Sequence, residues 1–208
     1  MKKQFSDKQL HILDVAEELI AQKGFDGTSV RDISAKAQVN VAMISYYFGS
    51  KEKMMVSLYQ YRVLRTREHF AAFNESIRDA RPEVQLKEVL SYVVNQLLKY
   101  KYFHGFVTQE IRHTDRVKDI LLDFYQTFVT VLDEIIRKGH ATGIFKNKIK
   151  SEDLVSMIIG TVVFVIRNPK FYEIYLPEDD KDYLLKTEKK VRNHLLLSVF
   201  SVLGYQTP

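Results

Sequence analysis

The chain has 208 residues, of which 46% are hydrophobic and 27% charged, a balance typical of a folded globular protein rather than a disordered one. It contains no cysteine, which excludes disulfides, thiolate zinc sites and a cysteine nucleophile and fits a reducing cytoplasm. The formal net charge of +5 permits an anionic partner without identifying one.

The N-terminal segment predicts an amphipathic helix with clear start and stop signals. Ser6 is a good N-cap, and Gln9 three residues later completes a capping box. Apolar residues then recur with helical period until Gly24, a residue suited to the left-handed conformation that ends helices.

Two shorter helices are expected next, separated by a very short break at Gln38 and Val39. Thr28 or Ser29 is placed to cap the first of them. Asn40 is placed to cap the second, which Gly49 ends. Two short helices joined by a turn of three or four residues form a helix-turn-helix, whose second helix can lie in the DNA major groove.

The second of these short helices carries an unusual pair of neighbouring tyrosines. Ile44 and Phe48, four residues apart, point to one side and form its buried face, so Tyr46 and Tyr47 are turned elsewhere. A tyrosine ring can pack on a sugar while its hydroxyl donates to a phosphate oxygen, which gives an exposed pair a use on DNA. The alternative is that the two rings cover a neighbouring helix, and the spacing alone does not decide between the two.

Residues 24–54, GFDGTSVRDISAKAQVNVAMISYYFGSKEKM, resemble the DNA-binding domain of the tetracycline-repressor (TetR) family of bacterial regulators. The matching residues are Gly24, Phe25, Thr28, Ser29, Val30, Arg31, Ile33, Val39, Ile44, Tyr47, Phe48, Ser50, Lys51 and Glu52. Two positions depart from the family pattern. Gln38 stands where a glycine is usual, so the turn must avoid or tolerate a left-handed backbone. Ser45 replaces a usual tyrosine, which puts a DNA contact at that position in doubt.

The resemblance implies a set of DNA-contacting residues, namely Thr28, Ser29, Arg31, Asn40, Val41, Ala42, Ser45, Tyr46, Tyr47 and Lys51. In this assignment the two hydroxyl residues bind phosphate at a helix N-terminus, the residues from 40 to 42 face the bases, and the tyrosines clamp the backbone. Arg31 is assigned to a base edge, and the alternative is a solvated charge. Lys51 is assigned to a phosphate.

The rest of the chain also predicts helices, so the expected fold is all-α. It comprises an N-terminal three-helix domain over residues 1–50 and a helical ligand-binding and dimerisation domain over 51–208. The helical pattern runs unbroken from Lys51 to Phe73, and Pro82 suits the start of a further helix. Ser151 is expected to cap the helix that contains Leu154–Ile166. The sequence NPKFYEIYLPEDD predicts an irregular connection before the last helix, near 181–203.

The segment Leu154–Ile166 is apolar on every side and should be buried on more than one. The resemblance implies that the helices at 151–167 and 181–203 pair with their mates in a second subunit, and Gly160 would allow close approach. The alternative is that this segment is simply the central helix of a monomer.

The resemblance also implies a ligand pocket among the middle helices. The candidate residues are Tyr92, Phe103, Phe106, Gln109, Arg112, His113, Tyr125, Phe128, Phe164 and Asn168. The aromatic residues together with Arg112 favour an apolar ligand with one polar or anionic group. The alternative is that these aromatic residues only fill the core.

No catalytic motif supports an enzyme. Glu110 and His113 have the spacing of half a di-iron site, but no second copy follows, and we expect neither metal nor cofactor. The N-terminus has no apolar core of a signal peptide and no apolar run reaches the roughly 20 residues needed to span a bilayer, so we expect a cytoplasmic protein without a membrane partner.

The sequence therefore predicts a dimeric DNA-binding regulator, a repressor released from a palindromic operator by a small apolar or amphipathic ligand. Two alternatives stay open. One is a DNA-bound interaction protein without a ligand, such as a nucleoid-associated division regulator. The other is a di-iron or ligand-carrying helical protein, which bound metal would favour.

Overall fold

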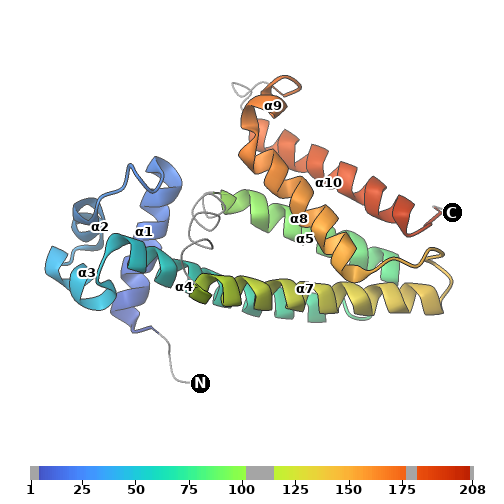
Figure 1. Ribbon diagram of the computed structural model, residues 1–208, viewed down its shortest axis with the longest axis horizontal. Helices are drawn as coiled ribbons and strands as arrows, with labels where there is room; N and C mark the ends of the chain where they lie inside the picture. The colour runs from blue at the N-terminus through green and yellow to red at the C-terminus, as the bar shows by residue number, and fades with distance from the viewer. Residues whose placement is uncertain (1–4, 102–114, 177–181, 207–208) are drawn as a thin grey trace. The chain divides into compact units, whose positions relative to one another are not determined.

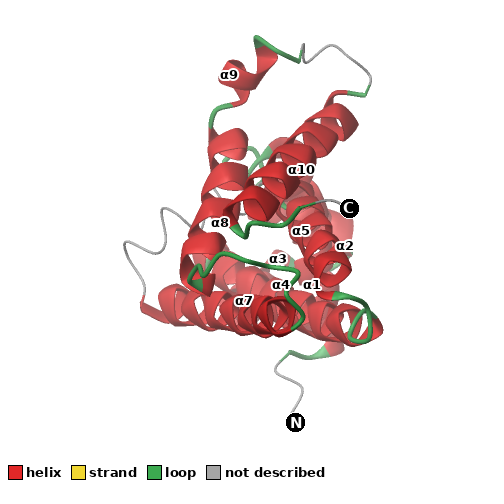
Figure 2. Ribbon diagram, turned by 90° about the vertical axis from the view of Figure 1, so that its right-hand side faces the viewer, coloured by secondary structure: helices red, strands yellow, loops and turns green. Residues whose placement is uncertain are grey.

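The computed structural model describes residues 5–101, 115–176 and 182–206, and this part of the chain is helical with no strand, as Figures 1 and 2 show. The helices are α1 (Asp7–Lys23), α2 (Val30–Ala37), α3 (Val41–Phe48), α4 (Lys51–Ser76), α5 (Pro82–Lys99), α7 (Asp115–Ala141), α8 (Ser151–Arg167), α9 (Pro169–Glu173) and α10 (Tyr183–Val202). The all-α prediction is confirmed.

The described residues form two compact units, and α4 belongs to both. The first unit holds α1, α2, α3, the part of α4 up to Arg67, and the start of α7. The second holds the last turns of α4 together with α5, the remainder of α7, and the helices that follow.

The first unit is built on the helix signals found in the sequence. Ser6 and Gln9 form the expected capping box at the start of α1. Ser29, rather than Thr28, caps α2, and its partner in a second capping box is Asp32. These hydrogen bonds from Ser29 hold the pKa of the Asp32 carboxyl below its usual value, so the cap is made by an ionised group.

The turn between α2 and α3 accepts a left-handed backbone without glycine. Gln38 has φ 55° and ψ 42°, and among the described residues it is the one non-glycine residue with positive φ. The turn is held by backbone hydrogen bonds, in which Gln38 donates to the carbonyl of Ala35 and Val39 to that of Ser34. The sequence had left open whether this turn avoids or tolerates the left-handed conformation, and it tolerates it.

The helix α4 is a single uninterrupted element of 26 residues. Ser50 caps it, because its hydroxyl accepts from the backbone N–H of Lys53 at 3.2 Å. The predicted helix from Lys51 to Phe73 is thus confirmed and extends to Ser76. No glycine or proline falls inside it, so nothing in its sequence introduces a hinge.

In the second unit α5 lies against both α8 and α10, which also contact one another (Figure 2). The hydrophobic core between these helices includes the fully buried residues Leu86, Val89 and Leu90 of α5 and Leu154 and Ile158 of α8. Apolar residues of α7 and the last turns of α4 complete this core. None of the helices in the described ranges is both long and apolar enough to cross a membrane.

Several details of this unit differ from the sequence predictions. Lys150, not Ser151, is the N-cap of α8, because Ser151 is buried and donates to the carboxylate of Asp133 at 3.1 Å. The connection predicted to be irregular contains the short helix α9, which Pro169 starts in the first-turn position that suits proline.

The apolar segment of α8 is buried on one side only within this chain. Leu154, Val155, Ile158, Val162 and Val165 are buried, whereas Phe164 is 48% exposed. Burial on more than one side is not reached within the single chain, so it stays a prediction for the dimer. Sequence periodicity cannot distinguish a face that packs within the chain from one available to another molecule.

The left-handed backbone conformation of Gln38 gives a first testable prediction. A non-glycine residue in this conformation costs about 1–2 kcal/mol, so we expect Gln38→Gly to raise the free energy of unfolding by about 1 kcal/mol. Gln22→Gly is the matched control, because Gln22 is exposed within α1 and glycine there should destabilise by a similar amount. Thermal unfolding followed by circular dichroism should give shifts of opposite sign. Equal destabilisation by both would contradict the strain at Gln38.

Candidate DNA interface and effector domain

The helix α3 is held by two buried side chains, and most of its other side chains are exposed to solvent. Ile44 is 1% exposed and Phe48 is 7% exposed, as their spacing predicts. Tyr46, in contrast, is 83% exposed, and Ser45 beside it is exposed too. Tyr46 therefore covers no neighbouring helix, which removes that alternative for this residue.

Tyr47 lies between its two aromatic neighbours. Its ring centroid is 5.3 Å from that of Tyr46 and 6.2 Å from that of Phe48, both in edge-on geometry. Half-buried Tyr47 thus joins the exposed ring to the buried one. This arrangement limits the rotamers of Tyr46 and holds a phenol outward from the helix surface.

The N-terminal end of α3 is open and carries small or polar side chains. Asn40 is its N-cap, and the side-chain oxygen of Asn40 accepts from the backbone N–H of Ala42 at 2.9 Å. Asn40, Val41 and Ala42 are all exposed. The three residues expected to face bases therefore form one accessible patch at the start of this helix.

At the start of α2 the two predicted phosphate ligands differ. Ser29 is exposed, whereas Thr28 is fully buried and its hydroxyl donates to the carbonyl of Gly24 at 2.8 Å. The hydroxyl of Thr28 therefore fixes the preceding turn and does not reach the surface, which corrects the side-chain role assigned to it. Arg31, the second residue of α2, is exposed.

Lys51 opens α4 in a fixed position. Its ammonium nitrogen lies 3.9 Å from the ring centroid of Phe25, in the turn that joins α1 to α2. This cation–π contact holds the charge near the surface while leaving its hydrogen-bond donors available.

Cross-helix ion pairs occupy several acidic residues of this unit. Over residues 1–55 there are eight Lys or Arg against seven Asp or Glu, so this stretch is nearly neutral, and Arg62, Arg65 and Arg67 then make the stretch up to Arg67 positive. Glu17 pairs with Arg62, Glu18 with Lys36 at 2.6 Å, and Asp14 with Arg65 at 3.7 Å. These pairs compensate three carboxylates of α1, while Arg31 and Lys51 place positive charge at the start of α2 and of α4.

Two positioning residues were missed in the sequence. The side chain of His11 shares a hydrogen bond with the carbonyl of Ala37, its Nε2 atom lying 3.1 Å away, at the end of α2 where the turn begins. Glu17 is only 8% exposed and joins α1 to α4 through Arg62. An acidic residue on the apolar stripe of α1 was the available signal for Glu17, whereas nothing in the sequence singled out His11.

The predicted ligand-pocket residues gather only in part among the described residues, where Tyr92 and Phe128 both contact the ring of Phe70. Phe103, Phe106, Gln109, Arg112 and His113 lie outside the described ranges. Of the rest, Phe128 is buried in the core, Phe164 is 48% exposed, and Asn168 ends α8. Tyr92 stacks on Phe73, with 4.6 Å between ring centroids.

Tyr125 alone of that set lines a pocket found in the described part of the chain. This hollow, of about 330 Å³, lies between α7 and α8 and is lined by Tyr125, Val129, Glu152, Val155, Ser156, Ile159 and Gly160. Burial raises the pKa of the Tyr125 phenol, so it remains a neutral hydrogen-bond donor. No group of three or more His, Cys, Asp or Glu residues is placed to hold a metal ion within the described ranges.

A capped helix-turn-helix with an exposed second helix, followed by a separate helical unit, defines the class of a DNA-binding regulator. Comparison with known families agrees. Residues 12–58 match the family described as "Bacterial regulatory proteins, tetR family", and residues 82–195 match "Tetracyclin repressor-like, C-terminal domain". The chain belongs to the TetR family of transcriptional regulators, and it is a DNA-binding protein rather than an enzyme.

Similar proteins span nearly the whole chain. The HTH-type transcriptional repressor NicS of Pseudomonas putida is 28% identical, over 86% of this chain and 84% of its own. The solved structure of the fatty acid degradation regulator FadR from Bacillus halodurans is 26% identical, with a TM-score of 0.66 over 93% of this chain and 97% of that one. FadR from Bacillus subtilis, solved in complex with stearoyl-CoA, is 23% identical with a TM-score of 0.61 over 90% and 97%.

The contrast between Tyr46 and Phe48 gives a second prediction. Tyr46→Ala should leave the free energy of unfolding within about 0.5 kcal/mol of the wild type, because the ring is exposed. Phe48→Ala should cost about 3–5 kcal/mol, because that ring is buried. Chemical denaturation measures both, and a large loss for Tyr46→Ala would mean that its ring serves the fold.

Proposed function

We propose that this regulator is a homodimeric repressor that binds a pseudo-palindromic operator and releases it when a small apolar or amphipathic ligand binds its second unit. The observation that carries the DNA part is the one-sided burial of α3. Two side chains hold the helix, while Asn40, Val41, Ala42, Ser45 and Tyr46 remain accessible.

The contacts divide by chemistry. Arg31 reads a base edge from α2, and the exposed start of α3 faces the bases, where the small side chain of Ala42 allows close approach. Ser29, Tyr46, Tyr47 and Lys51 bind the phosphate backbone. Backbone contacts orient the protein, whereas base contacts choose the sequence.

Exposed surface on α8 and α10 supports the proposed dimer. Ser156, Gly160 and Phe164, spaced four residues apart, form an exposed stripe along α8. A Cβ atom added at Gly160 would meet nothing within 4 Å in this chain, so a second helix can approach closely there. On α10, Leu197 is 75% exposed. A two-fold interface through these helices would cover apolar surface that this chain leaves open.

The similarity to fatty acid regulators supports an acyl thioester of coenzyme A as the first effector to test. FadR from Bacillus subtilis has been solved with stearoyl-CoA bound. Such a ligand is amphipathic and anionic, which agrees with the aromatic residues and the single arginine singled out in the sequence. The alternative is a DNA-bound interaction protein without a ligand. Such a protein would bind no acyl-CoA, and its operator affinity would not change when acyl-CoA is added.

The two units communicate in this proposal through α4, which is anchored at both ends. In the first unit Arg62 pairs with nearly buried Glu17. In the second, the ring of Phe70 lies 5.5 Å from that of Tyr92 and 6.2 Å from that of Phe128. The proposed domain boundary, between residues 1–50 and 51–208, lies at the start of this helix, whereas the compact units divide after Arg67.

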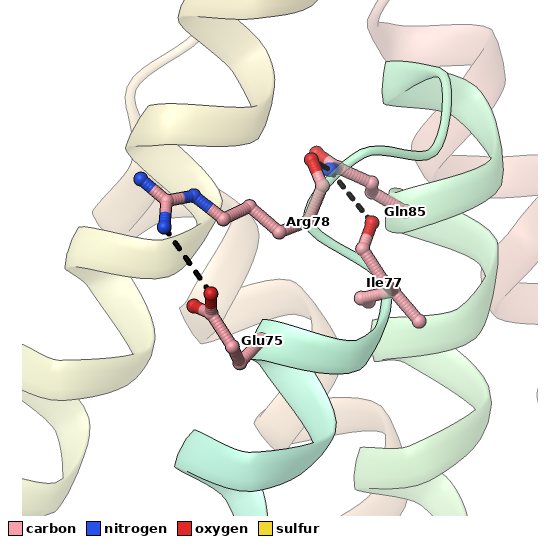
Figure 3. Close-up of polar contacts among 4 residues, drawn as sticks. All are labelled: Glu75, Ile77, Arg78 and Gln85. Atoms are coloured by element: carbon pink, nitrogen blue, oxygen red, sulfur yellow. Dashed lines mark hydrogen bonds and ion pairs between the residues drawn. The ribbon is translucent and has the colours of Figure 1, made fainter.

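The C-terminal end of α4 has a second anchor, shown in Figure 3. The side-chain amide of Gln85, buried on α5, donates to the backbone carbonyls of Ile77 and Arg78. Glu75 and Arg78 form an ion pair beside it at 3.2 Å. Carbonyls that follow the end of α4 are thus bonded to α5, so a shift of α5 would be transmitted to α4.

The division of DNA contacts gives a third prediction. Operator sequences selected from random duplexes should be pseudo-palindromic, because a two-fold dimer presents two recognition helices. Lys51→Ala should weaken binding to all duplexes alike and reduce the slope of log affinity against log salt by roughly 0.9 for each phosphate that the variant leaves unneutralised. Arg31→Ala should lower the discrimination between bases at one operator position by about 1–3 kcal/mol. Uniform loss in both variants would contradict this division.

The role of α4 gives a fourth prediction. Arg67→Gly with Glu68→Gly should soften α4 where the two units divide, because glycine costs about 1 kcal/mol relative to alanine in a helix. Operator and ligand should both still bind, but the ligand should no longer change operator affinity. The matched control, Arg67→Ala with Glu68→Ala, loses the same side chains and should keep a coupling of about 1–3 kcal/mol, or 5- to 150-fold.

Fluorescence anisotropy of labelled operator, with and without saturating acyl-CoA, measures this coupling. If the glycine variant still releases operator as the alanine variant does, α4 does not carry the signal. If wild-type protein binds operator but responds to no acyl-CoA, the proposed effector class is wrong while the DNA-binding role stands.

A further inference from the structure

The end of α8, the short helix α9 and the start of α10 lie together at one corner of the second unit (Figure 1). Twelve large hydrophobic residues are exposed in the described part of the chain, and half of them fall between residues 164 and 185. We call this group the α9 corner; its members are Phe164, Phe171, Ile174, Tyr175, Leu184 and Leu185. Single exposed apolar residues are ordinary, but a gathered set marks an interaction surface.

The corner is organised around one ring. The centroid of Phe171 lies 5.6 Å from that of Phe164 on α8 and 5.6 Å from that of Tyr175, both edge-on. The ammonium of Lys190 on α10 lies 5.1 Å from the ring centroid of Tyr175. These contacts fasten α9 to both flanking helices, so its outer surface is already formed and a partner need not order it.

The most exposed residues of the corner cannot form polar interactions with water or with a nucleic acid. Ile174 is 74% exposed, Leu184 is 64% exposed and Leu185 is 66% exposed, and none of the three can form a side-chain hydrogen bond. Their surface is stabilised only by apolar contact. The occupant is therefore itself apolar.

A second copy of this chain fits that description. Phe164 belongs both to the α9 corner and to the exposed stripe of α8 that runs through Ser156 and Gly160, so the two surfaces are continuous. Two-fold association places the same apolar surface on both partners, which makes it self-complementary in character.

We propose that the α9 corner is buried against a second copy of this chain and extends the dimer interface beyond the paired helices α8 and α10. This inference rests on the proposed dimer. It assigns α9 a role in holding the subunits together, which the paired helices alone would not require.

Ile174→Asp tests the corner, because Ile174 is the most exposed of its residues and the change disturbs no buried side chain of the single chain. Sedimentation equilibrium should show the dimer dissociation constant rising at least about tenfold, since the variant would place an unpaired carboxylate in an apolar interface. Val84→Asp is the matched control, because Val84 is 39% exposed in the first turn of α5, where an acidic residue is compatible with the helix. Its dissociation constant should stay at the wild-type value.

A second measurement keeps the test independent of folding defects. The chain has no cysteine, so Ile174→Cys and Val84→Cys each introduce a single reactive thiol. Maleimide labelling at Ile174→Cys should slow when the protein concentration rises above the dimer dissociation constant, whereas labelling at Val84→Cys should not change.

The outcomes separate the two proposals. A wild-type protein that sediments as a monomer at tens of micromolar contradicts the dimer itself. A stable dimer in which Ile174→Asp has no effect and both thiols label at a constant rate overturns only the α9 corner. Slower labelling with phosphatidylglycerol vesicles but not with protein concentration would assign the corner to a lipid surface and overturn the second copy as its occupant.

Discussion

The ion pair between Glu17 and Arg62 is the contact on which the DNA-binding unit depends. It joins α1 to α4, and both side chains are largely removed from solvent. Breaking such a pair by removing one partner typically costs about 3–5 kcal/mol, because the remaining charge stays buried. The same helix α1 bonds to α2 through His11 and, at its surface, through Glu18. The helix α1 therefore fixes α2, and with it the turn into α3, relative to the first part of α4.

The two ends of α4 are held by different kinds of contact. In the first unit the contact with Glu17 is directional and charged, so it permits little change of angle without loss. In the second unit the contacts of Phe70 and Phe73 with Tyr92 are between rings, each worth about 0.5–1.5 kcal/mol beyond burial and tolerant of small displacements. In the proposed mechanism, a helix held by a charged pair at one end and by stacked rings at the other would move at the second end and carry its first end with it.

The sequence predicted most of the fold because its local signals agree with one another. Capping residues, helical periodicity and the absence of glycine placed α1 to α4, and the predicted caps at Ser6, Asn40 and Ser50 were all found. The failures have physical causes. Ser151 reads as a cap, but its hydroxyl bonds to Asp133 on a helix 18 residues earlier in the chain, which no local pattern reveals.

Site prediction from the sequence was less complete for the same reason. Helical spacing separated exposed Tyr46 from buried Phe48, because both lie on one short helix of known period. It could not show that Thr28 is buried, since a threonine beside a helix start has the same local signal whether its hydroxyl faces water or the carbonyl of Gly24. The pocket residues needed contacts between distant helices, and periodicity carries no information on those.

The cap of α3 limits what its first residue can read. An asparagine usually recognises adenine with both ends of its amide, donating through nitrogen and accepting through oxygen. Here the oxygen of Asn40 already accepts from the backbone N–H of Ala42. An amide oxygen has two lone pairs, so the cap leaves Asn40 one acceptor site and both N–H donors for a base, but it fixes the direction in which the amide points. In the proposed complex Asn40 would turn its amide to suit a different base only by giving up the cap that starts the helix.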